Sequence, residues 1–176
     1  GDALTDADYN VVVGTSALSA DTLGSRSIAI GYKALEAQNF TTATDTYNVA
    51  MGHFAGGSIT TGTQNTLIGY DSGQAVTTGI QNTLVGAYVG DALTDGADNV
   101  AVGYNSLGAD TRGTKSVAIG KEALKVQNQT TSVSTYNVAV GFKAGVAVTT
   151  GIKNTFVGAE AGDSATDSSL CVALGF

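Results

Sequence analysis

The chain has 176 residues, of which 43% are hydrophobic and 13% are charged, and its formal net charge is −7. Abundant apolar residues with few charges exclude intrinsic disorder, and the negative balance disfavours binding to nucleic acid or to an anionic membrane. Apolar runs are only a few residues long, so the sequence predicts no helix that inserts into a membrane.

A short motif of the form Asn-Val-Ala-Val-Gly recurs along the whole chain. Its closing glycines are Gly14, Gly31, Gly52, Gly69, Gly86, Gly103, Gly120, Gly141, Gly158 and Gly175. Successive glycines lie 17 residues apart, except for two intervals of 21, and this spacing pattern itself repeats after 89 residues. We therefore expect one domain over 1–176, built as two tandem blocks of five repeats, 1–89 and 90–176.

Each motif predicts a short strand just before its glycine. In chain order these strands are expected at 11–13, 28–30, 49–51, 66–68, 83–85, 100–102, 117–119, 138–140, 155–157 and 172–174. Helical repeats need more than about 30 residues, whereas 17 residues suffice for one turn of a β-solenoid. The absence of proline fits continuous strand pairing. The sequence predicts an all-β, parallel β-solenoid of about ten rungs.

Alternation within the strands predicts which side chains face inward. The first and third strand positions carry Val, Ile or Thr in most rungs, and we expect them to face the core. The middle position is then expected to face outward, although it is apolar throughout. Soluble monomers avoid such a stripe, so we predict that it forms the interface of a closed homotrimer. The candidate interface residues are Val12, Ala29, Ala50, Leu67, Leu84, Ala101, Ala118, Ala139 and Phe156.

The two 21-residue rungs differ from the others in their turns, Glu36–Thr46 and Lys125–Thr135. Four additional residues in a tight coil are expected to bulge outward. Such a bulge is either a tolerated surface loop or a contact surface for a cell-surface receptor or glycan. The candidate contact residues are Asn39, Phe40, Thr41, Asn128, Gln129 and Thr130.

Three further positions recur in the repeat. The residue after the glycine is often aromatic, and Tyr32, Tyr70 and Tyr104 are candidates for stacking on a glycan; the alternative is a packing ladder, which would also accommodate His53. Asn four residues before the glycine predicts a stacked side-chain ladder at a corner. Thr eight residues after the glycine forms a third column. The only cysteine, Cys171, is interpreted as a structural residue.

Catalytic and metal-binding patterns are missing from the sequence. It has no zinc-ligand spacing and no Gly-x-Ser-x-Gly nucleophile elbow, so we predict a protein that is not an enzyme and has no cofactor. Calcium at the recurring aspartates (Asp2, Asp6, Asp8 and Asp91, Asp95, Asp98) is an alternative to simple turn residues. Two other functions remain open: ice binding through the Thr column, and polysaccharide cleavage, which needs paired carboxylates.

The segments Arg26-Ser27-Ile28-Ala29-Ile30-Gly31 and Lys115-Ser116-Val117-Ala118-Ile119-Gly120 resemble the head repeats of YadA-type trimeric autotransporter adhesins, whose signature is Asn-Ser-Val-Ala-Ile-Gly. That resemblance implies a trimeric, left-handed parallel β-roll. The segments 77–86 and 98–107 look more like repeats of phage tail fibres. Both resemblances imply an extracellular attachment role, and we favour a phage tail fibre over a bacterial adhesin head.

Overall fold

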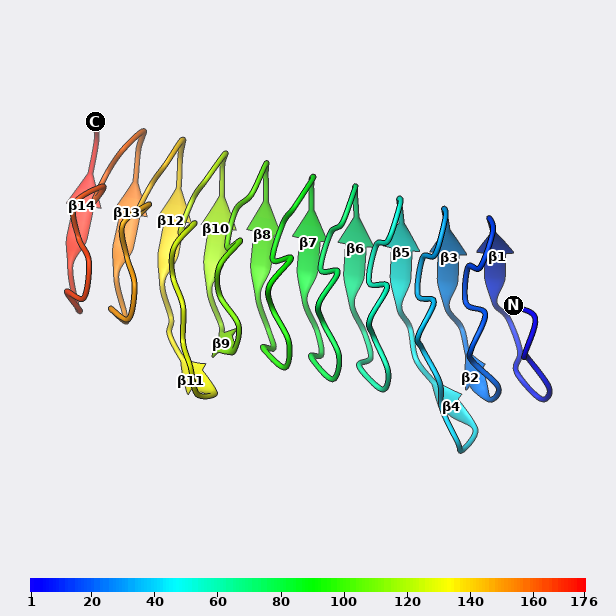
Figure 1. Cartoon of the computed structure of the whole chain (residues 1–176). Helices are drawn as coiled ribbons and strands as arrows, with labels where there is room; N and C mark the ends of the chain where they lie inside the picture. Colours follow the sequence, from blue (N-terminus) through cyan, green and yellow to red (C-terminus); the bar gives the residue numbers. More distant parts are fainter.

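The computed structural model describes all of residues 1–176 and confirms a β-solenoid of ten stacked rungs (Figure 1). Every rung contributes one three-residue strand to a continuous parallel sheet. The ten strands are β1 (Val11–Val13), β3 (Ile28–Ile30), β5 (Val49–Met51), β6 (Thr66–Ile68), β7 (Thr83–Val85), β8 (Val100–Val102), β10 (Val117–Ile119), β12 (Val138–Val140), β13 (Thr155–Val157) and β14 (Val172–Leu174). None of the elements is a helix of the length and apolarity needed to cross a bilayer.

Strand order in this sheet follows the chain, and each strand pairs in parallel with the next. The register follows the repeat: Thr83 pairs with Val100, 17 residues on, and Ile28 pairs with Val49, 21 residues on. All ten strands lie where the motif predicts them. The long rungs therefore keep the sheet in register and place their additional residues elsewhere.

Those residues form two small parallel sheets outside the main one. β2 (Gly24–Ser25) pairs with β4 (Thr44–Asp45), and β9 (Gly113–Thr114) pairs with β11 (Val133–Ser134). In Figure 1 the segments around β4 and β11 extend beyond the edge formed by the turns of the neighbouring rungs. The predicted outward bulges are confirmed.

The predicted asparagine ladder is also confirmed. The Asn65 side chain donates from Nδ2 to the carbonyl of Gly79 at 2.9 Å, and its Oδ1 accepts the backbone N–H of Asn82 at 3.0 Å. The same pair of bonds recurs in successive rungs and fixes the corner before each strand. Cys171 occupies this column in the last rung, where its backbone N–H donates to Asn154 Oδ1. Its role is structural, as expected.

The predicted assignment of the strand faces is wrong. The middle column, from Ala29 through Leu67 to Phe156, is buried inside the solenoid, whereas the first and third positions face outward. These middle side chains are between 0% and 1% exposed in every inner rung, so they cannot form an interface between subunits. The solenoid interior is too narrow for two large aliphatic side chains from every strand, and it accepts one inward side chain per strand instead.

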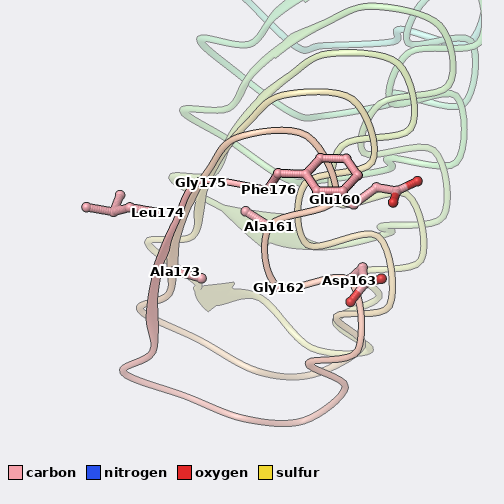
Figure 2. A pocket seen from close by; sticks show the side chains of 8 residues that line it. All are labelled: Glu160, Ala161, Gly162, Asp163, Ala173, Leu174, Gly175 and Phe176. Carbon is pink, nitrogen blue, oxygen red and sulfur yellow. The ribbon is translucent and has the colours of Figure 1, made fainter.

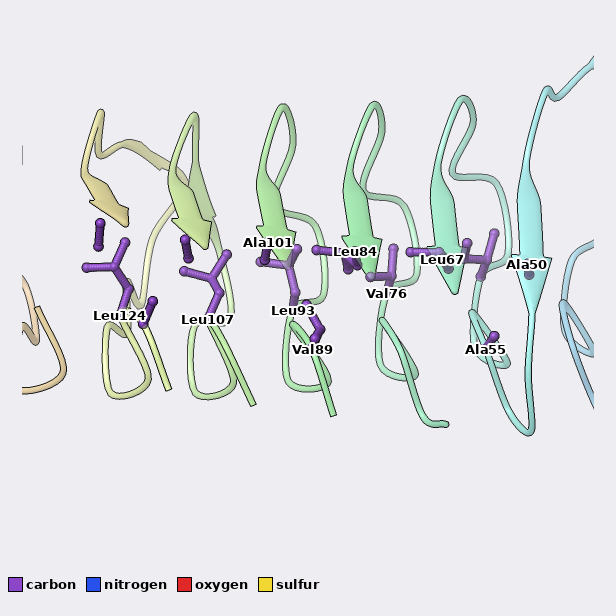
Figure 3. Packing of buried hydrophobic residues seen from close by; sticks show 14 of the residues in the cluster. Ala50, Ala55, Leu67, Val76, Leu84, Val89, Leu93, Ala101, Leu107 and Leu124 are labelled. Atoms are coloured by element: carbon purple, nitrogen blue, oxygen red, sulfur yellow. The ribbon is translucent and has the colours of Figure 1, made fainter. Parts of the chain in front are cut away.

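The core is completed by side chains from the turn opposite the sheet. In four rungs the strand contributes Ala and a Leu stands four residues after the preceding glycine, as at Ala29 with Leu18 and at Ala118 with Leu107; Ala101 and Ala173 have a glycine there instead. Where the strand contributes Leu67 or Leu84, that turn position is a glycine instead. Figure 3 shows these layers following one another along the axis.

Space explains this exchange. A Cβ built on Gly56 would lie 2.6 Å from Leu67 Cδ1 and 3.1 Å from Leu35 Cδ2, and its φ is +57°. Leu35 occupies the equivalent position with φ 51°. A leucine can therefore adopt this left-handed backbone where burial of its side chain in the core offsets the strain. Strand and turn residues therefore vary together to keep the packed volume constant.

Candidate functional site

The outward side of the ten-stranded sheet is an apolar strip, which we call the sheet face. It consists of the first and third positions of every strand, and of these twenty positions seventeen are aliphatic and three are Thr (Thr66, Thr83 and Thr155). Val13 is 58% exposed and Ile119 is 38% exposed. No charged residue interrupts the sheet face over its entire length, which makes it a candidate interaction surface.

An aromatic ridge runs along the turns that follow the sheet. We define it by six exposed rings and the half-buried ring of Phe54; the exposed rings are Tyr32, His53, Tyr70, Tyr88, Tyr104 and Phe142. His53 stacks between Tyr32 and Tyr70, with ring centroids 5.1 Å and 5.0 Å away and interplanar angles of 26° and 7°. The packing role expected for His53 is thus the one observed. Because these rings cover one another, Tyr32 and Tyr70 have less free ring surface for a glycan than the sequence suggested.

Lysines occupy both ends of the aromatic ridge. Lys33 Nζ lies 5.7 Å from the ring centroid of Tyr32 and 5.2 Å from that of Phe54. At the other end, Lys121 lies 5.8 Å from Tyr104 and 5.9 Å from Phe142. The middle of the ridge, at Tyr70 and Tyr88, has no lysine or arginine over its rings, and Asp71 lies near Tyr88.

Burial raises the pKa of the Asp91 carboxyl above its ordinary value, and the charge of Asp71 raises it further. The pKa of the Tyr88 hydroxyl is raised mainly by desolvation, with Tyr70 and Asp71 as additional causes. Asp71 lies 3.8 Å from His53 Nδ1, and neither aspartate pairs with a Lys or Arg. We call Tyr70, Asp71, Tyr88 and Asp91 the ridge centre. Sequence inspection missed Tyr88 and Asp71 because they stand outside the aromatic column, and it considered Asp91 only as a turn residue or calcium ligand.

The projecting loops contain the six residues predicted to contact a receptor. Asn39 and Thr41 are exposed, as are their counterparts Asn128 and Thr130. Phe40 and Gln129 are buried, with 7% and 6% exposure, so for these two the prediction of a receptor contact is wrong. Their side chains point inward because the backbone N–H of each donates to a buried aspartate of the preceding rung, Asp21 or Asp110.

A buried polar network supports each loop from inside. Asp21 accepts hydrogen bonds from Gln38 Nε2 and from the backbone N–H of Gly24 and Phe40. Gln38 in turn donates to Ser27 Oγ and accepts from Asn48 Nδ2 at 2.9 Å. The second block repeats this network with Asp110, Gln127, Ser116 and Asn137. All these polar atoms have partners, so the network has a structural role.

The remaining candidate chemistries find little support in the geometry. No group of three or more His, Cys, Asp or Glu side chains comes together in the structure. Hydroxyls of the Thr column donate along the coil, as Thr77 does to the carbonyl of Thr94 at 3.2 Å. Asn39 and Asn128 interrupt that column.

A hollow lies at the C-terminal end of the coil, where the last rung has no neighbour (Figure 2). Its lining residues are Glu160, Ala161, Gly162, Asp163, Ala173, Leu174, Gly175 and Phe176. Phe176 and Leu174 are fully or largely exposed, as expected for an uncovered end of the core. The hollow therefore combines residues of the turn after β13 with residues of β14 and the positions that follow it.

Comparison of the chain with protein-family models, with curated proteins and with solved structures finds no match.

Proposed function

We propose that this chain is a stiff segment of a trimeric extracellular fibre, in which three copies pack along their sheet faces. The observation that carries the proposal is the continuous, uncharged sheet face. Its aliphatic side chains are partly exposed in a single chain, a condition that soluble proteins relieve by association. The resemblance to trimeric adhesin and phage tail-fibre repeats supports the same arrangement, and a phage tail fibre that attaches to a host cell is the function we favour.

A second copy of the chain is the partner that best fits this surface. Ten strands about 4.8 Å apart extend over roughly 43 Å. A partner must therefore present an uncharged surface of similar length to the sheet face. Another copy has the same length, the same strand spacing and the same apolar columns. Closed rotational symmetry would bury every copy's sheet face equally. The correction of the strand faces therefore moves the predicted interface to the neighbouring columns, Val13, Ile30 and their equivalents.

The fold suits a spacer more than an enzyme. Main-chain hydrogen bonds, the asparagine ladder and the core all connect each rung to the next, so stability accumulates along the axis and the rod resists bending. The proposal therefore includes no catalytic step. The loop residues Asn39, Thr41, Asn128 and Thr130 remain candidates for a receptor contact, because they are exposed on a rigid support. Ice binding is less well supported, since the Thr hydroxyl protons are already used along the coil.

The test is the native molar mass, measured by light scattering after size exclusion. We expect three chains for the wild type and a single folded chain for the double variant Ile68→Glu/Ile119→Glu, which places charges on the sheet face. The matched control Gln64→Glu/Gln81→Glu adds the same charge at exposed positions outside the strands and should remain trimeric. Far-ultraviolet circular dichroism checks that each variant folds. A wild type that remains a single chain at all concentrations would overturn the proposal.

A further inference from the structure

The two long edges of the sheet face differ in chemistry. Because neighbouring strands are parallel throughout (Figure 1), every strand begins at one edge and ends at the other. The aromatic ridge follows the ends of the strands. The other edge is lined by the residue five positions before each closing glycine, a set that we call the corner column and that runs from Tyr9 to Leu170. All ten of its members are exposed, and none is a glycine.

The backbone of the corner column is left-handed in every rung, with φ between 51° and 65°. Glycine or asparagine adopts this conformation at less cost than a large side chain does. Six positions nevertheless carry an aromatic or cationic residue: Tyr9, Arg26, Tyr47, Lys115, Tyr136 and Lys153. These side chains point into solvent and add nothing to the core. Large exposed residues kept on a strained backbone indicate a contact outside the chain.

The corner column places cations among aromatic rings along its edge. The Arg26 guanidinium lies 4.9 Å from the ring centroid of Tyr9 and 5.9 Å from that of Tyr47, and Lys115 Nζ lies 5.4 Å from that of Tyr136. Lys115 and Lys153 form no ion pair with a carboxylate. The ridge presents exposed rings at the opposite edge, and cations are attracted to such rings. The two edges of the sheet face are therefore complementary to each other.

The relative direction of two copies decides which of these edges meet. When parallel copies are related by rotation about the rod axis, the corner column of one lies beside the ridge of the next. Antiparallel copies instead bring corner column to corner column. If all ten strands overlap, the second rung then faces the ninth, which places Arg26 against Lys153 of the partner subunit. Because like charges in contact oppose association, the edges favour parallel copies.

We propose that the corner column of each chain packs against the aromatic ridge of a second copy and thereby aligns the chains in parallel, with their N-terminal ends together. This inference rests on the proposed function, since it specifies how the three copies of the fibre meet. The apolar sheet face supplies most of the buried area, whereas the edges set the direction. Polar contacts at the rim of an interface govern orientation more than affinity, so single changes in the corner column should leave the trimer intact.

The experiment is disulfide cross-linking in a Cys171→Ser background. Gln81→Cys in the corner column is combined with a cysteine at the ridge edge of the preceding, the same or the following rung: Tyr70→Cys, Ala87→Cys or Tyr104→Cys. The strands separate the two edges within one chain, so a disulfide forms only between copies. We expect oxidation of at least one double variant to give a covalent trimer on a non-reducing denaturing gel.

The single-cysteine variants are the matched controls and should remain uncross-linked. Gln81 lies near the middle of the rod, so its two copies would meet in an antiparallel pair. Covalent dimers of Gln81→Cys alone, or a trimer that none of the three double variants cross-links, would overturn the inference. Light scattering of the reduced samples keeps this result distinct from failure of the proposed function. A wild type that remains a single chain would overturn both.

Discussion

Each block contains two adjacent polar rungs followed by apolar rungs, and the two kinds of rung solve the same packing problem differently. In apolar rungs, the position seven residues after the glycine carries Ile59, Val76 or Val148, which packs with the strand residue of its rung. In polar rungs the same position carries Asp21 or Gln38, and the equivalents Asp110 or Gln127 in the second block. All these side chains are buried to the same extent. The comparison teaches that the interior tolerates a carboxylate wherever neighbouring rungs supply every hydrogen-bond partner.

The polar rungs are also the place where the loops leave the coil. A loop has backbone N–H groups that no neighbouring rung can pair, and the buried aspartate accepts one of them, from Phe40 or Gln129. The leucine on the turn, Leu18 or Leu107, then restores the apolar volume that the polar column gives up. Polar core, turn leucine and projecting loop therefore occur together.

The largest effect is expected when the buried carboxylate is removed. Asp110→Ala would leave the backbone N–H groups of Gly113 and Gln129 without a partner and would remove one of the two acceptors of Gln127 Nε2, which keeps its bond to Ser116 Oγ. Each buried unpaired donor costs about 1–3 kcal/mol, so we expect a loss of several kcal/mol in the free energy of unfolding. Urea denaturation measures it.

The matched control is Asp167→Ala, an exposed aspartate whose loss should change stability little. The reverse substitution, Val76→Asp, places a carboxylate in an apolar rung and should destabilise strongly, because no glutamine or loop N–H meets it there. A Val76→Asp variant as stable as wild type would contradict the distinction between the two kinds of rung.

An intermediate effect is expected when the core residues are exchanged between the two kinds of rung. Leu67→Ala in an apolar rung should cost about 2–5 kcal/mol through the cavity left opposite Gly56. Ala118→Leu in a polar rung should cost about 1–3 kcal/mol, because Leu107 already fills that space. Adding Leu107→Gly to Ala118→Leu should recover part of the loss, as measured by the thermal midpoint; an additive double variant would refute the size exchange.

The smallest effect is expected in the asparagine ladder. Asn82→Ser copies the residue found at positions 27 and 116, but without the network that surrounds it there. The variant loses the bond to the Gly96 carbonyl and leaves the N–H of Asn99 unpaired, so a cost of about 1–3 kcal/mol is expected. Hydrogen exchange of the Asn99 amide should quicken selectively. Unchanged protection at Asn99 would show that the ladder does not hold the corner.

The sequence predicts the rungs well because register and period depend only on spacing. Alternation, by contrast, is satisfied by two opposite assignments of the strand faces. The signal that separates them lies outside the strand: the middle residue is large at Leu67 and Phe156 where the turn residue is glycine, and small at Ala29 and Ala118 where it is leucine. Two positions show such an inverse relation in size only when both side chains lie in the same core, so this relation would have indicated that the middle strand residue faces inward.

The buried aspartates illustrate a second limit. Asp21 alone reads as a surface turn residue, since charged side chains are seldom buried without partners. Its partner Gln38 lies 17 residues on, one rung away, and the pair recurs as Asp110 and Gln127. Tyr88 was missed for a related reason, because its ring enters the ridge from the position next to the aromatic column.

The rung pattern of the first block recurs in the second block 89 residues later. The two blocks meet between β7 and β8, and these strands pair in parallel as all other neighbouring strands do. Recombination between the blocks would therefore delete or add five rungs at once without creating a foreign junction. Each such event would change the length of the rod by roughly 24 Å and would add or remove one projecting loop and one buried carboxylate together. Rod length and loop number would thus change together in one genetic event. The rod could become longer or shorter while every pair of neighbouring rungs keeps the same contacts.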